Sequence, residues 1–145
     1  MKKILALVFA FSIISCFCVF AAPETLPYGF KSTTWGILTV TNPAQSYITS
    51  YDKVHNISGY ATSGVNLSMY YFNGNCYSLL YNKNGSPISF TIGASGMFVQ
   101  PVNLGYGKNL LLVRAELNGQ VQYVYRTVTV LSSNIYNLIN GFSIF

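Results

Sequence analysis

Charged side chains are scarce in this sequence. Of its 145 residues only 8% are charged, and its acids and imidazole amount to three Asp or Glu residues and one histidine, His55. General acid–base catalysis and metal binding both need several such groups in one place, so the composition predicts a non-enzymatic protein without a metal ion or cofactor. After the two N-terminal lysines the cationic residues stand singly. The absence of a basic cluster argues against a nucleic-acid partner.

The few candidate groups are also poorly placed for catalysis. Asp52 and His55 are close in sequence, but a third metal ligand would have to come from Glu24 or Glu116, far along the chain. A solvated polar turn is therefore the better interpretation of Asp52 and His55. Neither Cys76 nor any serine lies in a nucleophile motif, and glycoside hydrolysis would require two of the three carboxylates to converge.

Cysteine is nearly absent. Cys16 and Cys18 lie in an N-terminal hydrophobic run, which leaves Cys76 alone in the remainder of the chain. One cysteine forms no internal disulfide. Cys76 is therefore interpreted as a buried or partly buried small apolar residue, with pairing between two chains as the alternative.

The N-terminus carries the pattern of a secretion signal. Two lysines precede an apolar run, residues 4–20, and Val19-Phe20-Ala21 places small residues where a signal peptidase reads the chain. We expect residues 1–21 to be removed and the mature protein to be secreted or held at the cell surface. Two alternatives stay open. The run is nearly long enough for an uncleaved membrane anchor, and Ile13-Ile14-Ser15-Cys16 resembles a lipobox that would lipidate its cysteine.

The rest of the chain is a series of short strand-like segments. Residues 22–36, with Pro23 and Pro27, are expected to form an extended arm. From residue 37 to residue 131, runs of β-branched and aromatic residues alternate with turns rich in Gly, Asn, Pro and Ser, which is typical of a sandwich or barrel. No segment there has a helical period. The predicted fold is all-β, an antiparallel β-sandwich of about seven to nine strands.

Alternation along the strands predicts which side chains face the core. The inward positions are Val65, Leu67, Met69 and Tyr71, then Leu111, Val113 and Ala115, and finally Val124, Val128 and Val130. Pro101 lacks an amide hydrogen, so its strand is predicted to lie at a sheet edge or to bend.

The region 37–131 also resembles a bacterial immunoglobulin-like domain. The resemblance lies in Ile57-Ser58-Gly59-Tyr60-Ala61, Gly64-Val65-Asn66-Leu67, Gly96-Met97-Phe98, Val102-Asn103-Leu104, Gly107-Lys108-Asn109-Leu110-Leu111-Leu112-Val113-Arg114-Ala115 and Val128-Thr129-Val130. It implies an immunoglobulin-like sandwich in a secreted or cell-surface protein, where such modules act as spacers or binding modules. The inter-sheet disulfide of antibody domains is missing here, because the mature chain has one cysteine.

A structural or assembly role through protein–protein contacts or self-association fits these features. In this hypothesis the arm 22–36 and the tail 132–145 pair with neighbouring subunits, for instance by adding a strand to an open sheet edge. The tail has one apolar helical face, formed by Ile135, Leu138, Ile139 and Phe142. The alternative role of this face is to cover an open end of its own sandwich.

Adhesion by binding a carbohydrate or another ligand is the second hypothesis. Outward-facing aromatic residues would form an exposed patch of the kind that marks interaction sites. The candidate binding residues are Tyr70, Phe72, Tyr123 and Tyr125, with Arg126 adjacent in sequence.

Overall fold

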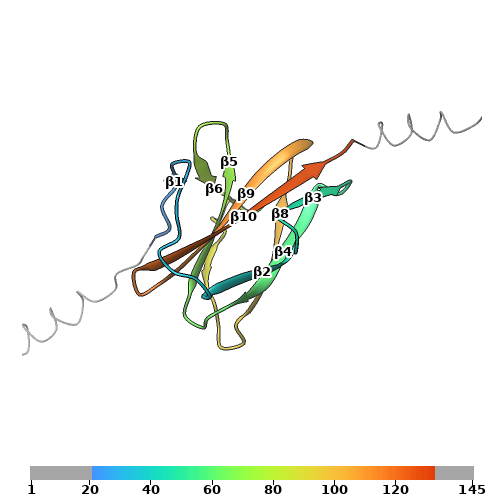
Figure 1. Ribbon diagram of the computed structural model, residues 1–145. Coiled ribbons are helices and arrows are strands. Elements are labelled where there is room, and N and C mark those ends of the chain that lie inside the picture. The colour runs from blue at the N-terminus through green and yellow to red at the C-terminus, as the bar shows by residue number, and fades with distance from the viewer. Residues whose placement is uncertain (1–20, 133–145) are drawn as a thin grey trace, which may run out of the picture.

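The computed structural model describes residues 21–132, which fold entirely as β-structure (Figure 1). The ten strands are β1 (Thr25–Leu26), β2 (Leu38–Asn42), β3 (Tyr47–Ser50), β4 (Val54–Ala61), β5 (Asn66–Phe72), β6 (Tyr77–Leu79), β7 (Ser89–Thr91), β8 (Met97–Asn103), β9 (Gly107–Leu117) and β10 (Gln120–Val130). The predicted all-β class is confirmed. The number of strands exceeds the prediction by one because the arm itself contributes β1. The described residues include no helix long and apolar enough to cross a membrane.

The strands form two sheets. The larger sheet has the order β1-β6-β5-β9-β10-β3, with β7 also paired to β5, and the smaller sheet has the order β2-β4-β8. Figure 1 shows the long β9 and β10 in the middle of the molecule, with β5 and β6 on one side and β4 and β8 on the other. Pairing is antiparallel throughout, except that β3 runs parallel to β10.

The core between the two sheets is almost wholly aliphatic. Its buried residues from the smaller sheet include Ile57, Phe98 and Val102, and those from the larger sheet include Leu67, Met69, Leu111, Val113, Ala115, Val128 and Val130. Burying one such large side chain contributes about 1.5–3 kcal/mol. The predicted inward positions are confirmed with one exception. Tyr71, at the end of β5, is 42% exposed and lines an open groove there.

Two polar side chains of β10 also point into the space between the sheets, where they hold β2. The amide oxygen of Gln122 accepts hydrogen bonds from the backbone N–H groups of Ile37 and Leu38, both at 3.0 Å, and its nitrogen donates to the Leu38 carbonyl at 2.9 Å. The guanidinium of Arg126 donates to the carbonyls of Pro43 at 2.8 Å and Val40 at 3.0 Å. These bonds join one edge of the smaller sheet to the larger sheet.

The positions of Asn, Gly and Pro residues in the backbone agree with the predicted turns and sheet edges. Asn118 and Gly119 have positive φ angles of 51° and 79°, which suits the tight hairpin between β9 and β10. Pro101 lies in β8, an edge strand of the smaller sheet, as predicted. At Gly59 in β4 an added Cβ would overlap the carbonyl oxygen of Thr39 in β2. The close pairing of β2 with β4 therefore requires glycine at this position.

The arm, predicted to be free, is ordered on its own chain, and its pairing with other subunits stays a prediction. Its β1 adds to the edge of β6, with Thr25 opposite Ser78 and Leu26 opposite Tyr77. Leu26 is buried, so the arm belongs to the fold of its own chain. The predicted signal peptide, except residue 21, and the tail after residue 132 lie outside the described residues.

Candidate binding surfaces

The four aromatic residues predicted to bind a ligand all lie on the larger sheet. Tyr70 and Phe72 belong to β5, and Tyr123 and Tyr125 belong to β10. Strand β9 separates them, and its residue Leu112 is the register partner of both Tyr70 and Tyr125. The four side chains therefore share the face of the sheet that points away from the core.

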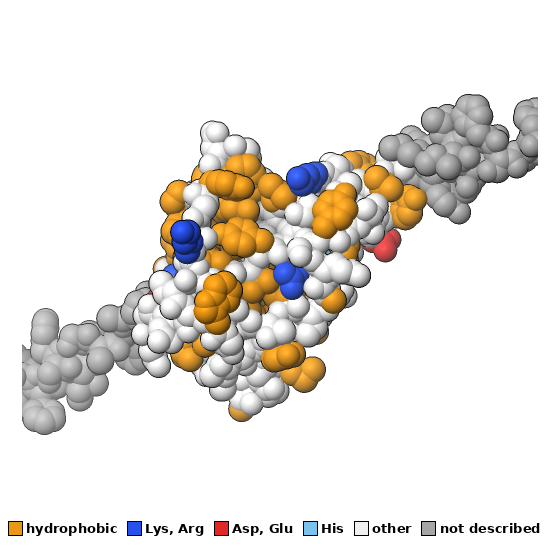
Figure 2. Space-filling model, in the orientation of Figure 1, with side chains coloured by type: hydrophobic (Ala, Val, Ile, Leu, Met, Phe, Trp, Pro, Cys, Tyr) orange, Lys and Arg blue, Asp and Glu red, His pale blue; other side chains and the backbone are white. Residues whose placement is uncertain are grey.

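The arm crosses this face and packs on it. The Phe30 ring stacks on Tyr123, with 5.2 Å between the ring centroids, and the Tyr125 hydroxyl donates a hydrogen bond to the Phe30 carbonyl at 3.0 Å. The Tyr28 ring lies 5.5 Å from Phe72 and 6.4 Å from Tyr77. We call these six residues the aromatic cluster: Tyr28, Phe30, Phe72, Tyr77, Tyr123 and Tyr125. Figure 2 shows hydrophobic side chains gathered over β1, β5 and β6.

The predicted patch is therefore largely covered, and its exposed part differs from the prediction. Tyr70 has no exposed surface, because it lies beneath the aromatic cluster together with Leu112. Tyr28 and Tyr125 are the exposed members, at 72% and 39%. Tyr28 and Tyr77 were not among the binding residues predicted from the sequence. Alternation of side chains along the strand that follows the turn at residues 73–76 could have shown that Tyr77 shares the outer face with Phe72.

Burial shifts the pKa values of three tyrosines on this face. It raises the pKa of Tyr70 to about 12, and it also raises the pKa values of Tyr77 and Tyr125. Tyr77 and Tyr125 of the aromatic cluster therefore offer neutral hydroxyl groups to a ligand at physiological pH.

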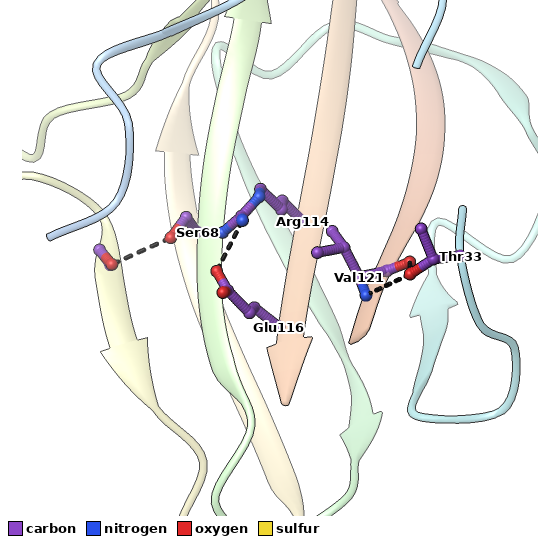
Figure 3. Close-up of polar contacts among 6 residues, drawn as sticks. Thr33, Ser68, Arg114, Glu116 and Val121 are labelled. Atoms are coloured by element: carbon purple, nitrogen blue, oxygen red, sulfur yellow. Dashed lines mark hydrogen bonds and ion pairs between the residues drawn. The ribbon is translucent and has the colours of Figure 1, made fainter. Parts of the chain in front are cut away.

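An ion pair lies on the same face of the larger sheet, between Arg114 and Glu116 of β9 (Figure 3). Arg114 and Glu116, two residues apart on β9, are joined by a contact of 2.6 Å, and their side chains are 12% and 22% exposed. Burial acts to lower the pKa of Arg114, but hydrogen bonds with Glu116 and Tyr123 and the charge of Glu116 outweigh it, and the pKa is raised. The positive charge of the guanidinium is thus paired with the Glu116 carboxylate within the sheet, so it is not available to a ligand.

Arg126 was a candidate binding residue because it is adjacent in sequence to Tyr125, but its side chain does not lie on the face of the aromatic residues. Its side chain lies on the opposite face of β10, where it donates to the Val40 and Pro43 carbonyls. Burial lowers the pKa of Arg126. Its position follows from alternation, because Val124 and Val128, two residues before and after it, face the core. Arg126 is a structural residue that links the two sheets.

A second candidate surface lies on the outer face of the smaller sheet. Tyr60 of β4 and Met97 of β8 are register partners, and Val99 follows two residues along β8. These side chains are 56%, 73% and 66% exposed. We call Tyr60, Met97 and Val99 the apolar patch. The patch was not predicted from the sequence, although Phe98 and Val102 face the core and alternation therefore places Met97 and Val99 outside.

The groups considered for catalysis do not converge. Among residues 21–132 no three His, Cys, Asp or Glu side chains lie close enough to hold a metal ion. Cys76 is partly buried and has a free thiol, and the Asn73 amide donates to its sulfur at 3.5 Å.

Comparisons with family models, with curated proteins and with solved structures found no match to this chain. The immunoglobulin-like resemblance therefore remains a prediction from the sequence.

Proposed function

We propose that this chain is a secreted, non-enzymatic protein of immunoglobulin-like architecture whose role is structural, and that it self-associates through the apolar patch of its smaller sheet. The observation that carries the proposal is the patch itself. Tyr60, Met97 and Val99 are neighbours on one sheet face, and each is more than half exposed. Contiguous exposed apolar surface on a folded domain marks an interaction site.

The charge distribution of the chain permits a second copy as the partner at this face. Residues 21–132 contain six Lys or Arg residues and three Asp or Glu residues. The net charge is positive, so two copies repel each other over most of their surfaces. Strands β2, β4 and β8 contain none of these charged residues. A two-fold pairing places the same surface on both sides of the contact, and a neutral face adds no repulsion to it.

The sheet edges are less suited to assembly than this face. The edge strands β1, β7, β3 and β2 have two, three, four and five residues, and short edges give few hydrogen bonds to an added strand. Strand β8 is longer, but Pro101 removes an amide donor from it. Contact between sheet faces is therefore favoured over strand addition.

The test is the oligomeric state of the mature chain, residues 22–145, by sedimentation velocity over a wide range of concentration. We expect a monomer–dimer equilibrium. Met97→Lys should raise the dimer dissociation constant at least tenfold, because each dimer would bury two added charges. Trp35→Lys is the matched control, since Trp35 is equally exposed, at 76%, but lies in the arm. A chain that stays monomeric, or a dimer indifferent to Met97→Lys, would contradict the proposal.

A further inference from the structure

We propose that a groove centred on Asn103, at the end of the molecule where β8 leads into β9, binds a neutral oligosaccharide. This site is separate from the apolar patch and from the aromatic cluster. It does not depend on self-association.

Two adjoining hollows form the groove, and Asn103 lines both. The first has a volume of about 450 Å³ and lies between the smaller sheet, at Gln100 and Pro101, and the loop 82–84. The second, of about 340 Å³, lies at the open end between the sheets and includes Tyr71. Each volume is in the range of small-ligand sites, roughly 300–1,000 Å³.

The second hollow has an apolar lining with an aromatic side chain at its mouth. Leu104 and Leu111 are 7% and 3% exposed, so they form its floor, whereas Tyr71 is 42% exposed. The nonpolar C–H face of a sugar ring packs well on such a surface, because an aromatic ring supplies a large rigid contact area.

Side-chain amides supply the polar groups of the groove. Asn84 and Asn103 line it, and neither side chain has a hydrogen bond in the described part of the chain. An amide offers two donor hydrogens and an acceptor oxygen, which suits neighbouring hydroxyl groups on a sugar. Asn109 is different, because its amide donates to the carbonyls of Gly105 at 2.9 Å and Gly107 at 3.0 Å. It fixes the loop that forms the wall.

The charge of the groove selects the class of ligand. Among residues 21–132 no Asp or Glu lines either hollow, and Lys83 is the one cationic residue along them. A polyanion needs several cations, and a cationic ligand needs a carboxylate. Amides, an aromatic ring and an apolar floor instead suit an uncharged molecule with many hydroxyl groups.

The experiment is titration of the ¹⁵N-labelled mature chain with cellotetraose, maltotetraose, mannotetraose and N-acetylchitotetraose, followed by NMR. We expect at least one of these sugars to shift the side-chain amide signals of Asn84 and Asn103. Asn103→Ala and Tyr71→Ala should each weaken binding about tenfold. Gln120→Ala, which removes an exposed amide at the opposite end of β9 and β10, should leave affinity unchanged.

Other outcomes overturn the proposal. Absence of binding by all four sugars, or shifts centred on Tyr28 and Tyr125, would show that the groove is not the site. Leu138→Asp, in the tail that follows β10, should not alter affinity. Tighter binding by this variant would instead identify the tail as the occupant of the groove. Met97→Lys should retain sugar binding, so a failure of the self-association proposal remains distinguishable.

Discussion

Replacing Gln122 by leucine tests how the two sheets are joined. Gln122 is 6% exposed, and its side chain makes three hydrogen bonds to the backbone of Ile37 and Leu38. Leucine is similar in size and fills the same space, but it bonds to none of these groups. The substitution therefore removes the hydrogen bonds while creating little cavity.

The cost follows from the backbone groups left without partners. A typical hydrogen bond contributes about 1 kcal/mol, and a buried polar group that loses its partner costs about 1–3 kcal/mol. Leu38 is 3% exposed, so water does not replace the bonds to its N–H and carbonyl, whereas the Ile37 amide is closer to solvent. With the apolar gain of leucine set against these losses, we expect destabilisation of about 3 kcal/mol.

Urea unfolding of the mature chain measures this quantity. The midpoint should fall while the slope with denaturant stays constant, because the unfolded surface is unchanged. Gln120→Leu is the matched control: Gln120 is exposed and lies two residues away on β10, so this change should alter stability by less than about 0.5 kcal/mol. A loss below about 1 kcal/mol for Gln122→Leu would show that these bonds do not hold β2 in place.

Three further substitutions test other parts of the structure. Tyr70→Phe should raise stability by about 1 kcal/mol, because the buried hydroxyl has no partner at hydrogen-bonding geometry among residues 21–132. The stability of the wild type should fall as the pH rises from about 10, where unfolded tyrosine ionises, to about 12, the pKa of folded Tyr70. Urea unfolding at each pH should show a smaller fall in stability for Tyr70→Phe than for the wild type. Gly59→Ala should lower the free energy of unfolding in urea by more than about 3 kcal/mol, because its Cβ would overlap Thr39. Gly93→Ala should not lower it in this way, because open space surrounds Gly93. Arg126→Met should cost about 2 kcal/mol in thermal unfolding through its lost carbonyl bonds, yet leave sugar binding unchanged.

The strand pattern could be predicted because a pleated strand alternates its faces regardless of the rest of the chain. Leu111, Val113 and Ala115 illustrate this, since all three are buried as predicted. The same rule places Arg126 inside, between Val124 and Val128. The charge of Arg126 instead suggested an exposed position. Composition alone does not show that the carbonyls of Val40 and Pro43 accept hydrogen bonds from its guanidinium.

Long-range partners could not be predicted from local pattern. Tyr70 faces away from the core, as alternation requires, but whether it is exposed depends on a segment some forty residues earlier. The prolines of that segment indicate an extended backbone and do not specify which surface it covers. Tyr71 shows the converse case, because its inward parity predicted burial, whereas it lies at the open end of the sheets and is 42% exposed.

The path of the arm bears directly on how the molecule can assemble. Thr33 donates its N–H to the Val121 carbonyl and accepts from the Val121 N–H through its hydroxyl, both at 2.8 Å (Figure 3). Ser32 likewise accepts from the Tyr123 N–H at 2.9 Å. The arm thus satisfies one half of the outer edge of β10, and β3 satisfies the other half. Among the described residues, a second copy could add to this edge only by displacing the arm or β3. The apolar patch on the outer face of the smaller sheet is exposed within residues 21–132, and for this reason assembly through that face is the prediction to test first.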